Sequence, residues 1–251
     1  MTFTSADLWH HYGRTRAESD REVPGVFRWG WGQDGGPGPE VLGDLAGRVV
    51  GDLGAGGARH AAHLAVHHDA AQVVAVDASP AQYEMATGMF GHLAPRLSIV
   101  RSDVVSYLRS AAGGYDVLYS VFGAVDFTDP RELLRAAALA LKPGGRLVFS
   151  TLAHCVDGAP GQPDVVAVDV RAKTPEGEAA TMRRWVLQEQ VWAKILDEAG
   201  FTGVNVELLP STVAGPHAVD TLLVSAVRPW ASPVARPPET RTFTRRHSNC
   251  A

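Results

Sequence analysis

The chain has 251 residues, of which 45% are hydrophobic and 20% charged, enough for a buried α/β core and unlike a disordered chain. It contains no apolar run of about 18 residues and no apolar leader, so we expect a cytoplasmic protein without a membrane span. The net charge of −4 argues against nucleic acid as the main partner. Two cysteines, Cys155 and Cys250, are too few for a disulfide framework or a zinc site.

The first 47 residues differ from the rest of the chain. A helix is expected at residues 6–18, and the glycine-rich segment 27–39 that follows contains Trp29 and Trp31. Because indole rings are rarely left in water, this segment is expected to pack on the core as a lid, to line a ligand pocket, or both.

From residue 48 the chain alternates short β-branched runs with segments of helical periodicity. This alternation predicts a parallel sheet with helices on both faces. Strands are expected at 48–53, 72–77, 97–100, 115–119 and 146–151, with helices at 59–69, 80–90, 104–110 and 130–141.

After the fifth strand the pattern changes. Two short strands at 165–171 and 180–187, around a turn at 174–177, predict a hairpin inserted at the carboxyl edge of the sheet. A helix at 189–199 ending at Gly200 and strands at 204–208 and 221–227 follow. The expected organisation is therefore an N-terminal helix and lid (1–47), a main domain (48–227) with a substrate-side insertion (155–187), and a Pro/Arg-rich tail (228–251).

The strongest local signal is the glycine-rich segment 51–59 (GDLGAGGAR), which follows a strand and opens a helix. Glycines allow a sharp turn and let a ligand approach the main chain, and the helix supplies free N–H groups. The segment lacks the Lys-Ser/Thr ending of a triphosphate loop, and Arg59 stands where the dinucleotide fingerprint has its third glycine. A turn without a ligand is the alternative.

Two acidic residues follow the next two strands. An acid in the position of Asp77 often caps the next helix, but here Ser79 and Pro80 supply a better start for that helix. Asp77 is therefore left to accept hydrogen bonds from both hydroxyls of a ribose. Asp103 can accept from an exocyclic amine or cap its own helix, and both interpretations stay open.

Taken together, these segments resemble class I S-adenosylmethionine-dependent methyltransferases. The resemblance rests on five stretches in the expected order between residues 45 and 152: 52–61, 75–80, 102–104, 115–122 and 141–147. It implies a doubly wound, mostly parallel α/β sheet of seven strands, with the last strand antiparallel beside the fifth. The N-terminal helical lid and the hairpin inserted after strand five would be additions to that sheet.

The resemblance also implies roles for individual residues in binding S-adenosylmethionine. Gly54 and Gly56 would lie under its methionine part, Asp77 would bind the ribose, and Asp103 the adenine amine. The other expected cofactor residues are Tyr12 from the N-terminal helix, Asp52 and Ala55 in the glycine segment, Ala78 and Val104 beside the adenine, Gln82, Ser102, and Ser120 and Phe122 near the sulfonium.

Acceptor chemistry is expected at the carboxyl ends of strands four and five, where ligands of such sheets gather. His154 is the favoured general base, with Asp126 second; a strand-capping histidine and a solvated turn carboxylate are the alternatives. The expected substrate-side residues are Trp29, Trp31, Phe127, Thr151 and Trp185. No metal is expected, and His60, His63 and His67 on one helix face are interpreted as a polar surface.

The sequence thus predicts methyl transfer to the O, N or C atom of a small molecule. A cofactor-binding enzyme without methyl transfer, such as a cyclase, and a protein or RNA methyltransferase are the alternatives. Arginine far outnumbers lysine, which is typical of GC-rich genomes and associates the chain with actinobacterial secondary metabolism and a natural-product acceptor. A homodimer is left open, and membrane partners are not expected.

Overall fold

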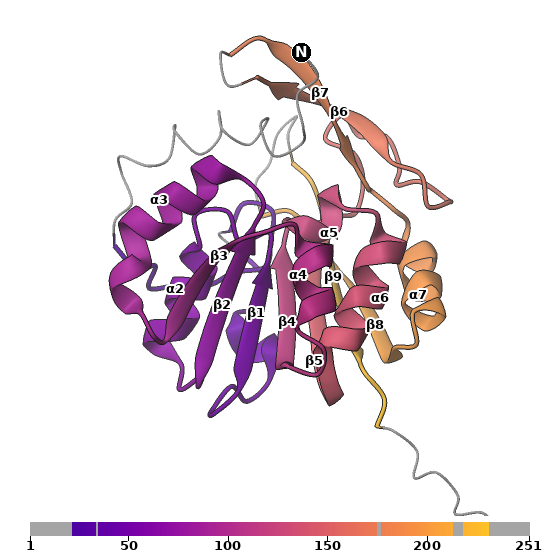
Figure 1. Ribbon diagram of the computed structural model, residues 1–251. Helices are drawn as coiled ribbons and strands as arrows, with labels where there is room; N and C mark the ends of the chain where they lie inside the picture. Colours follow the sequence, from indigo (N-terminus) through magenta and orange to yellow (C-terminus); the bar gives the residue numbers. More distant parts are fainter. Residues whose placement is uncertain (1–21, 34, 175–176, 213–217, 231–251) are drawn as a thin grey trace, which may run out of the picture.

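The computed structural model describes residues 22–33, 35–174, 177–212 and 218–230. A mostly parallel sheet of seven strands forms the centre of the fold. The parallel strands are β1 (Val49–Leu53), β2 (Gln72–Asp77), β3 (Leu97–Arg101), β4 (Tyr115–Val121) and β5 (Leu141–Leu152). The full order is β3-β2-β1-β4-β5-β9-β8 (Figure 1). Strand β9 (Thr221–Val227) runs antiparallel between β5 and the edge strand β8 (Thr202–Leu209), which confirms the predicted doubly wound sheet of seven strands.

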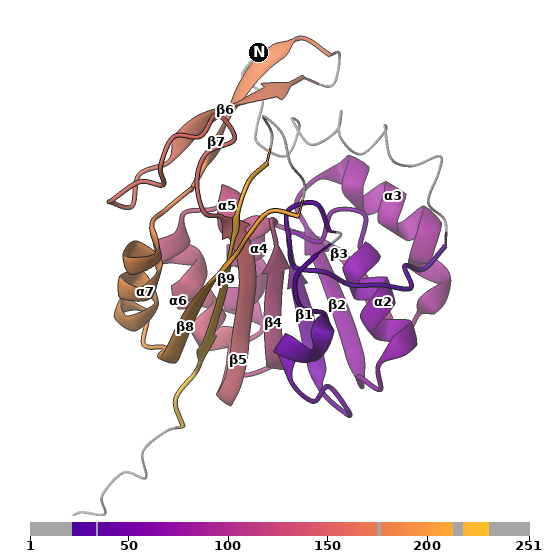
Figure 2. The same cartoon turned by 180° about the vertical axis from the view of Figure 1, so that it is seen from behind.

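Helices cover both faces of this sheet, which is why its central strands are largely apolar (Figures 1 and 2). Helices α4 (Val104–Ser110), α6 (Pro130–Ala140) and α7 (Glu189–Glu198) pack on one face around a single apolar cluster. A second cluster on the other face includes α2 (Arg59–His67), α3 (Pro80–Phe90) and the segment before β1. Three short elements were not predicted: η1 (Pro39–Leu42), η2 (Gly91–Leu93) and α5 (Ala124–Phe127).

The inserted hairpin consists of β6 (Val168–Lys173) and β7 (Ala179–Arg184), which form a two-stranded sheet of their own. It lies beyond the carboxyl ends of the central strands, at the top of Figure 1. Residues 185–187, predicted as strand, instead lead back to the main domain, where the Trp185 N–H donates to the Asp126 carbonyl at 2.8 Å. Strand β5, predicted from residue 146, begins at Leu141, and its pairing with β4 is irregular near that end.

Chain order reverses between β1 and β4, and the carboxyl ends of these two strands mark the usual ligand position of such a sheet. The predicted N-terminal helix with Tyr12, most of the tail, and Cys250 lie outside the described residues. Within the described part of the chain, no helix has the length and apolar character needed to cross a membrane.

Candidate cofactor and acceptor site

The glycine loop after β1 is held by main-chain contacts on both sides. The N–H groups of Gly54 and Ala55 donate to the Val76 carbonyl at 2.9 and 3.1 Å. Gly54 has a φ of 76°, and a Cβ built on it would lie 2.1 Å from the Ala124 nitrogen. A Cβ on Gly123 would lie 2.6 Å from the Gly54 carbonyl oxygen. The loops after β1 and β4 therefore touch backbone to backbone, and two glycines make that approach possible.

Asp77 lies directly against the glycine loop. Its Oδ2 accepts from the Gly56 N–H at 2.8 Å and its Oδ1 from the Ser79 N–H at 2.8 Å. Ser79 caps α3 through the Gln82 N–H, as predicted, yet Asp77 is not left without partners as the sequence suggested. Burial raises the pKa of Asp77, while these main-chain donors oppose the rise. The acid and the glycine bend thus form one unit.

Two further polar side chains of the expected cofactor site bind protein groups. The Tyr119 hydroxyl donates to Asp52 Oδ2 at 2.9 Å, and burial raises the pKa of Asp52 to about 7. Ser120 Oγ donates to the Leu53 carbonyl at 2.7 Å and is fully buried. In this structure Asp52 and Ser120 therefore tie β1 to β4 beneath the loop.

The segment after β3 shows the capping role that the sequence left open. Asp103 is exposed and accepts from the Ser106 N–H at 2.8 Å, which caps α4. Ser102 is half-buried and Val104 is buried beside it, while Ala78 after β2 is exposed. Contacts of these residues with an adenine ring remain predictions.

On the acceptor side, Asp126 is buried in an ion pair. Its Oδ2 accepts from Arg184 Nε at 3.0 Å and from Arg184 Nη2. Both side chains are almost fully buried, with 0% and 7% exposed. Burial raises the pKa of Asp126, whereas Arg184 and Thr151 lower it. The alternative of a solvated turn or helix-start carboxylate is wrong about solvation, although Asp126 does lie in the first turn of α5.

Aromatic rings surround the Arg184 guanidinium. Its Cζ lies 5.1 Å from the Trp31 ring centroid and 5.2 Å from that of Phe127, both within cation–π range. Trp31 is 39% exposed and meets Phe122 edge-on at 5.0 Å. The main-chain N–H of Trp31 donates to Thr221 Oγ1 at 3.0 Å, and this hydrogen bond ties the glycine-rich segment to β9. Phe122 itself has a φ of 47°, in the region that favours glycine.

The other two predicted substrate tryptophans belong to the core. Trp29 is 0% exposed, and its Nε1–H donates to the Gly38 carbonyl at 2.9 Å. Trp185 is 8% exposed and packs within the larger apolar cluster. Trp29 thus packs on the core, as one interpretation of the glycine-rich segment predicted, whereas a ligand pocket lined by Trp31 stays a prediction.

His154, the favoured base, has both ring nitrogens engaged by main-chain groups. Nδ1 donates to the Cys155 carbonyl at 3.0 Å, and Nε2 accepts from the Asp220 N–H at 3.2 Å. This pairing suits a neutral ring that joins β5 to the chain before β9. Base catalysis by His154 would require one of these bonds to break.

Of the three α2 histidines predicted to form a polar surface, His67 is exposed, whereas His60 and His63 are covered. His63 is buried, and its Nδ1 donates to the Pro24 carbonyl at 2.7 Å. The Phe27 ring lies 4.5 Å from that of His60, whose pKa burial lowers to about 4. The segment before β1 covers this helix face. Among the described residues, no group of three or more His, Cys, Asp or Glu could hold a metal ion.

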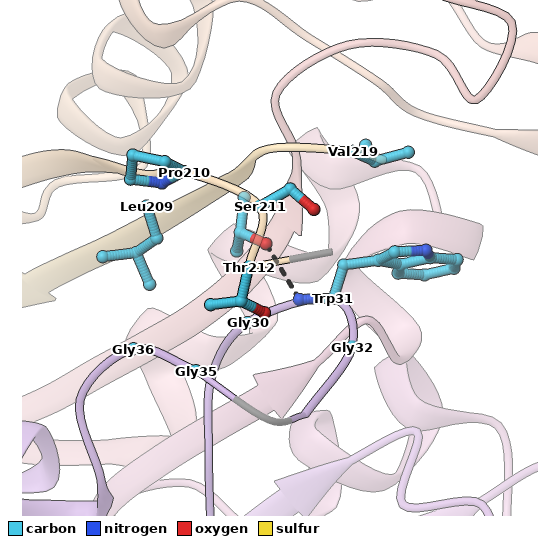
Figure 3. A pocket seen from close by; sticks show the side chains of 11 residues that line it. Gly30, Trp31, Gly32, Gly35, Gly36, Leu209, Pro210, Ser211, Thr212 and Val219 are labelled. Atoms are coloured by element: carbon cyan, nitrogen blue, oxygen red, sulfur yellow. Dashed lines mark hydrogen bonds between the residues drawn. The ribbon is translucent and has the colours of Figure 1, made fainter. Parts of the chain in front are cut away.

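A small hollow lies beside Trp31, between the glycine-rich segment and the chain from Leu209 to Thr221 (Figure 3). Its volume of about 10 Å³ is roughly the space of one water molecule, too small for an adenosyl group. This hollow therefore cannot hold the cofactor, and the glycine loop after β1 with Asp77 is the candidate cofactor site.

Three residues of the site were missed from the sequence. Gly123 could have been noticed as a glycine directly after the fourth strand, whereas Tyr119 looked like an ordinary strand residue. Arg184 carried no signal, because nothing distinguishes it from Arg183, which lies on the exposed face of the same strand.

Comparison with known proteins shows what this arrangement is similar to. Residues 50–145 match a family model described as a methyltransferase domain. The ubiquinone biosynthesis O-methyltransferase of Vibrio parahaemolyticus is 31% identical over 108 residues, which cover 43% of this chain and 45% of the relative. The O-methyltransferase resE of Aspergillus sclerotiorum is 29% identical over 133 residues, 50% of this chain and 47% of the relative. The chain thus spans about half the length of these curated relatives.

Solved structures share the fold over more of the chain. An S-adenosylmethionine-dependent methyltransferase from Mesorhizobium loti aligns with a TM-score of 0.53 and 22% identity over 75% of this chain and 94% of its own. The [4+2]-cyclase SpnF aligns with a TM-score of 0.64 and 15% identity over 90% of this chain and 96% of its own. Residues 50–145 are thus similar to a methyltransferase domain, and the sheet shares its fold with an S-adenosylmethionine-dependent methyltransferase.

Proposed function

We propose that this chain transfers the methyl group of S-adenosylmethionine to a small molecule bound at the carboxyl ends of β4 and β5. The observation that carries the proposal is the contact between the Gly56 N–H and the Asp77 carboxylate. This contact joins the glycine loop, whose backbone a ligand can approach, to Asp77, the acid that would bind the ribose. Both follow strands near the point where chain order reverses. Relatives that match the same half of the chain are O-methyltransferases.

The residues present fit the cofactor. Gly54 and Gly56 leave the loop without side chains, and a Cβ on Gly56 would lie 3.6 Å from Gln82 Oε1 at the entrance to α3. Asp77 would exchange one main-chain donor for the ribose hydroxyls, and Gln82 would lie beside them. When bound, the cofactor supplies an electrophilic methyl group on a positively charged sulfur.

The acceptor would meet a partly exposed aromatic wall and a buried acid. Trp31 and Phe122 would exclude water from the acceptor, and the hairpin β6–β7 would cover it from outside. Of the two proton acceptors considered from the sequence, Asp126 keeps one carboxylate oxygen without a hydrogen bond to a described residue. We therefore favour Asp126 over His154 as the base. A natural-product intermediate remains the expected class of acceptor.

A second function shares the cofactor but not the methyl transfer. Both candidate bases already have hydrogen-bond partners: His154 is bound by main-chain groups and Asp126 by Arg184. An enzyme that does not deprotonate its substrate would not need a base with a free acceptor atom. A cyclase with this fold is known among the structural neighbours, although that similarity concerns the fold alone.

Calorimetric titration with S-adenosylhomocysteine tests cofactor binding. The Asp77→Ala variant should bind at least tenfold more weakly than wild type, while Asp69→Ala, at an exposed acid before β2, should leave affinity unchanged. No binding by the wild-type chain, or equal affinities for all three proteins, would refute the proposal. Incubation with methyl-labelled S-adenosylmethionine and a metabolite extract then separates the two functions. Methyl transfer would place the label on a metabolite, whereas a cyclase would not.

A further inference from the structure

Three segments that are far apart in sequence meet at one guanidinium. Arg184 comes from the inserted hairpin, Phe127 from α5, and Trp31 from the segment before β1. Arg184 is 6% exposed, so its charge is balanced mainly by the Asp126 carboxylate that it contacts. The hairpin therefore contributes a functional group to the acceptor edge besides covering it.

The buried pair leaves hydrogen-bonding capacity unmatched. Arg184 directs Nε and Nη2 at the same oxygen of Asp126, so Oδ1 is buried without a hydrogen bond to a described residue. The Thr151 hydroxyl is also buried and makes no hydrogen bond of good geometry, although it lies near enough to the Asp126 carboxyl to lower its pKa. Arg184 Nη1 donates to no described residue and, unlike these two oxygens, is not fully enclosed. Buried polar atoms in folded proteins almost always have partners, so a donor–acceptor group is expected to complete this cluster.

The charges of the cluster restrict what that group can be. Asp126 and Arg184 together are neutral, so a carboxylate would place an unbalanced negative charge in a buried site. An ammonium group would face the Arg184 guanidinium. A neutral hydroxyl can donate to Asp126 Oδ1 and accept from Arg184 Nη1 or Thr151, and partly exposed aromatic rings favour a planar neighbour.

We propose that the methyl acceptor is the hydroxyl of an aromatic ring, bound between Asp126 Oδ1 and Arg184 Nη1. This inference rests on the proposed methyl transfer and names its acceptor class. When the O–H bond breaks, the proton passes to Asp126 Oδ1 and the bonding electrons stay on the acceptor oxygen. Asp126 becomes neutral, the oxygen becomes negative, and Arg184 then balances the oxygen in place of the carboxylate. The total charge of the cluster does not change.

The test uses 4-nitrophenol, whose ionisation changes its absorbance, and 4-nitroanisole, the same ring with its hydroxyl methylated. With S-adenosylhomocysteine present, the wild type should bind the phenol at least tenfold more tightly than the ether. Arg184→Met and Asp126→Asn should lose this preference and should change the pH at which the bound phenol ionises. Arg183→Met is the matched control, because Arg183 is exposed on the same strand, and it should keep both properties.

Because a broken buried pair could prevent folding, Thr151→Val serves as a second variant, which keeps the ion pair and removes only the buried hydroxyl beside it. It should fold with wild-type stability and lose at least threefold of the preference for the phenol. Equal binding of phenol and ether by the wild type, no saturable binding of either, or an unchanged preference in Thr151→Val and Arg184→Met would overturn the inference. Failure to bind S-adenosylhomocysteine would instead count against the proposed function itself.

Discussion

Replacing Gly54 by alanine tests the backbone contact between the loops after β1 and β4. Alanine at a φ of 76° costs about 1–2 kcal/mol in free energy of unfolding from the left-handed conformation alone. Its Cβ would lie 2.1 Å from a main-chain nitrogen, which cannot rotate away as a side chain would, and overpacking of this kind costs about 1–3 kcal/mol more. We expect Gly54→Ala to lower the free energy of unfolding by about 2–5 kcal/mol.

The matched control is Gly113→Ala. Gly113 has a φ of 64°, and a Cβ there would meet no atom within 4 Å, so only the cost of about 1–2 kcal/mol from backbone conformation applies. Urea denaturation of both variants measures the difference, and calorimetry should show weakened binding of S-adenosylhomocysteine for Gly54→Ala only. Equal losses of stability in the two variants would show that the loop contact is not the constraint we describe.

Three further predictions concern buried polar groups. Tyr119→Phe leaves an oxygen of Asp52 without its donor and should cost about 1–3 kcal/mol in urea denaturation; an unchanged free energy of unfolding would contradict the buried pairing. The folded-state pKa of Asp52, about 7, exceeds its ordinary value of 3.8, so the folded state binds more protons than the unfolded state and Asp52 reduces stability as pH rises from about 4 to 7. Asp52→Asn should therefore gain stability relative to wild type over that range, by a few kcal/mol at most. Parallel pH profiles of stability for the two proteins would exclude this. The pKa of His60 is lowered from 6.5 to about 4, so the folded state binds fewer protons and the wild type loses stability as pH falls through that interval; His60→Gln should flatten this acid limb, and an unaltered limb would assign it to other groups.

The sheet could be predicted closely because its signals are local. The helix start at Ser79 and Pro80 and the apolar runs of β1, β2 and β9 each follow from a few neighbouring residues. The contact between Gly56 and Asp77 also follows, because the parallel register sets the ends of β1 and β2 side by side.

The acceptor side could be predicted only in part, because its contacts join residues far apart in the chain. Asp126 was proposed from its position after the fourth strand, but its burial and its pairing with Arg184, 58 residues later, could not be predicted from there. His154 is an imidazole side chain at a strand end, but its Nε2 accepts a hydrogen bond from a main-chain N–H 66 residues away. Sequence periodicity carries no information about such partners. Trp29 and Trp31 likewise differ in exposure although they are two residues apart.

The hairpin β6–β7 shares no strand pairing with the main sheet and rejoins the domain at the Trp185 N–H and the Arg184–Asp126 pair. It also packs against Phe127 and Leu152 through side chains, but a segment that shares no ladder hydrogen bonds with the described strands of the main sheet can be exchanged without disturbing their pairing. Acceptor preference could therefore be re-engineered by grafting other hairpins at residues 168–184, provided that each graft retains an arginine opposite Asp126.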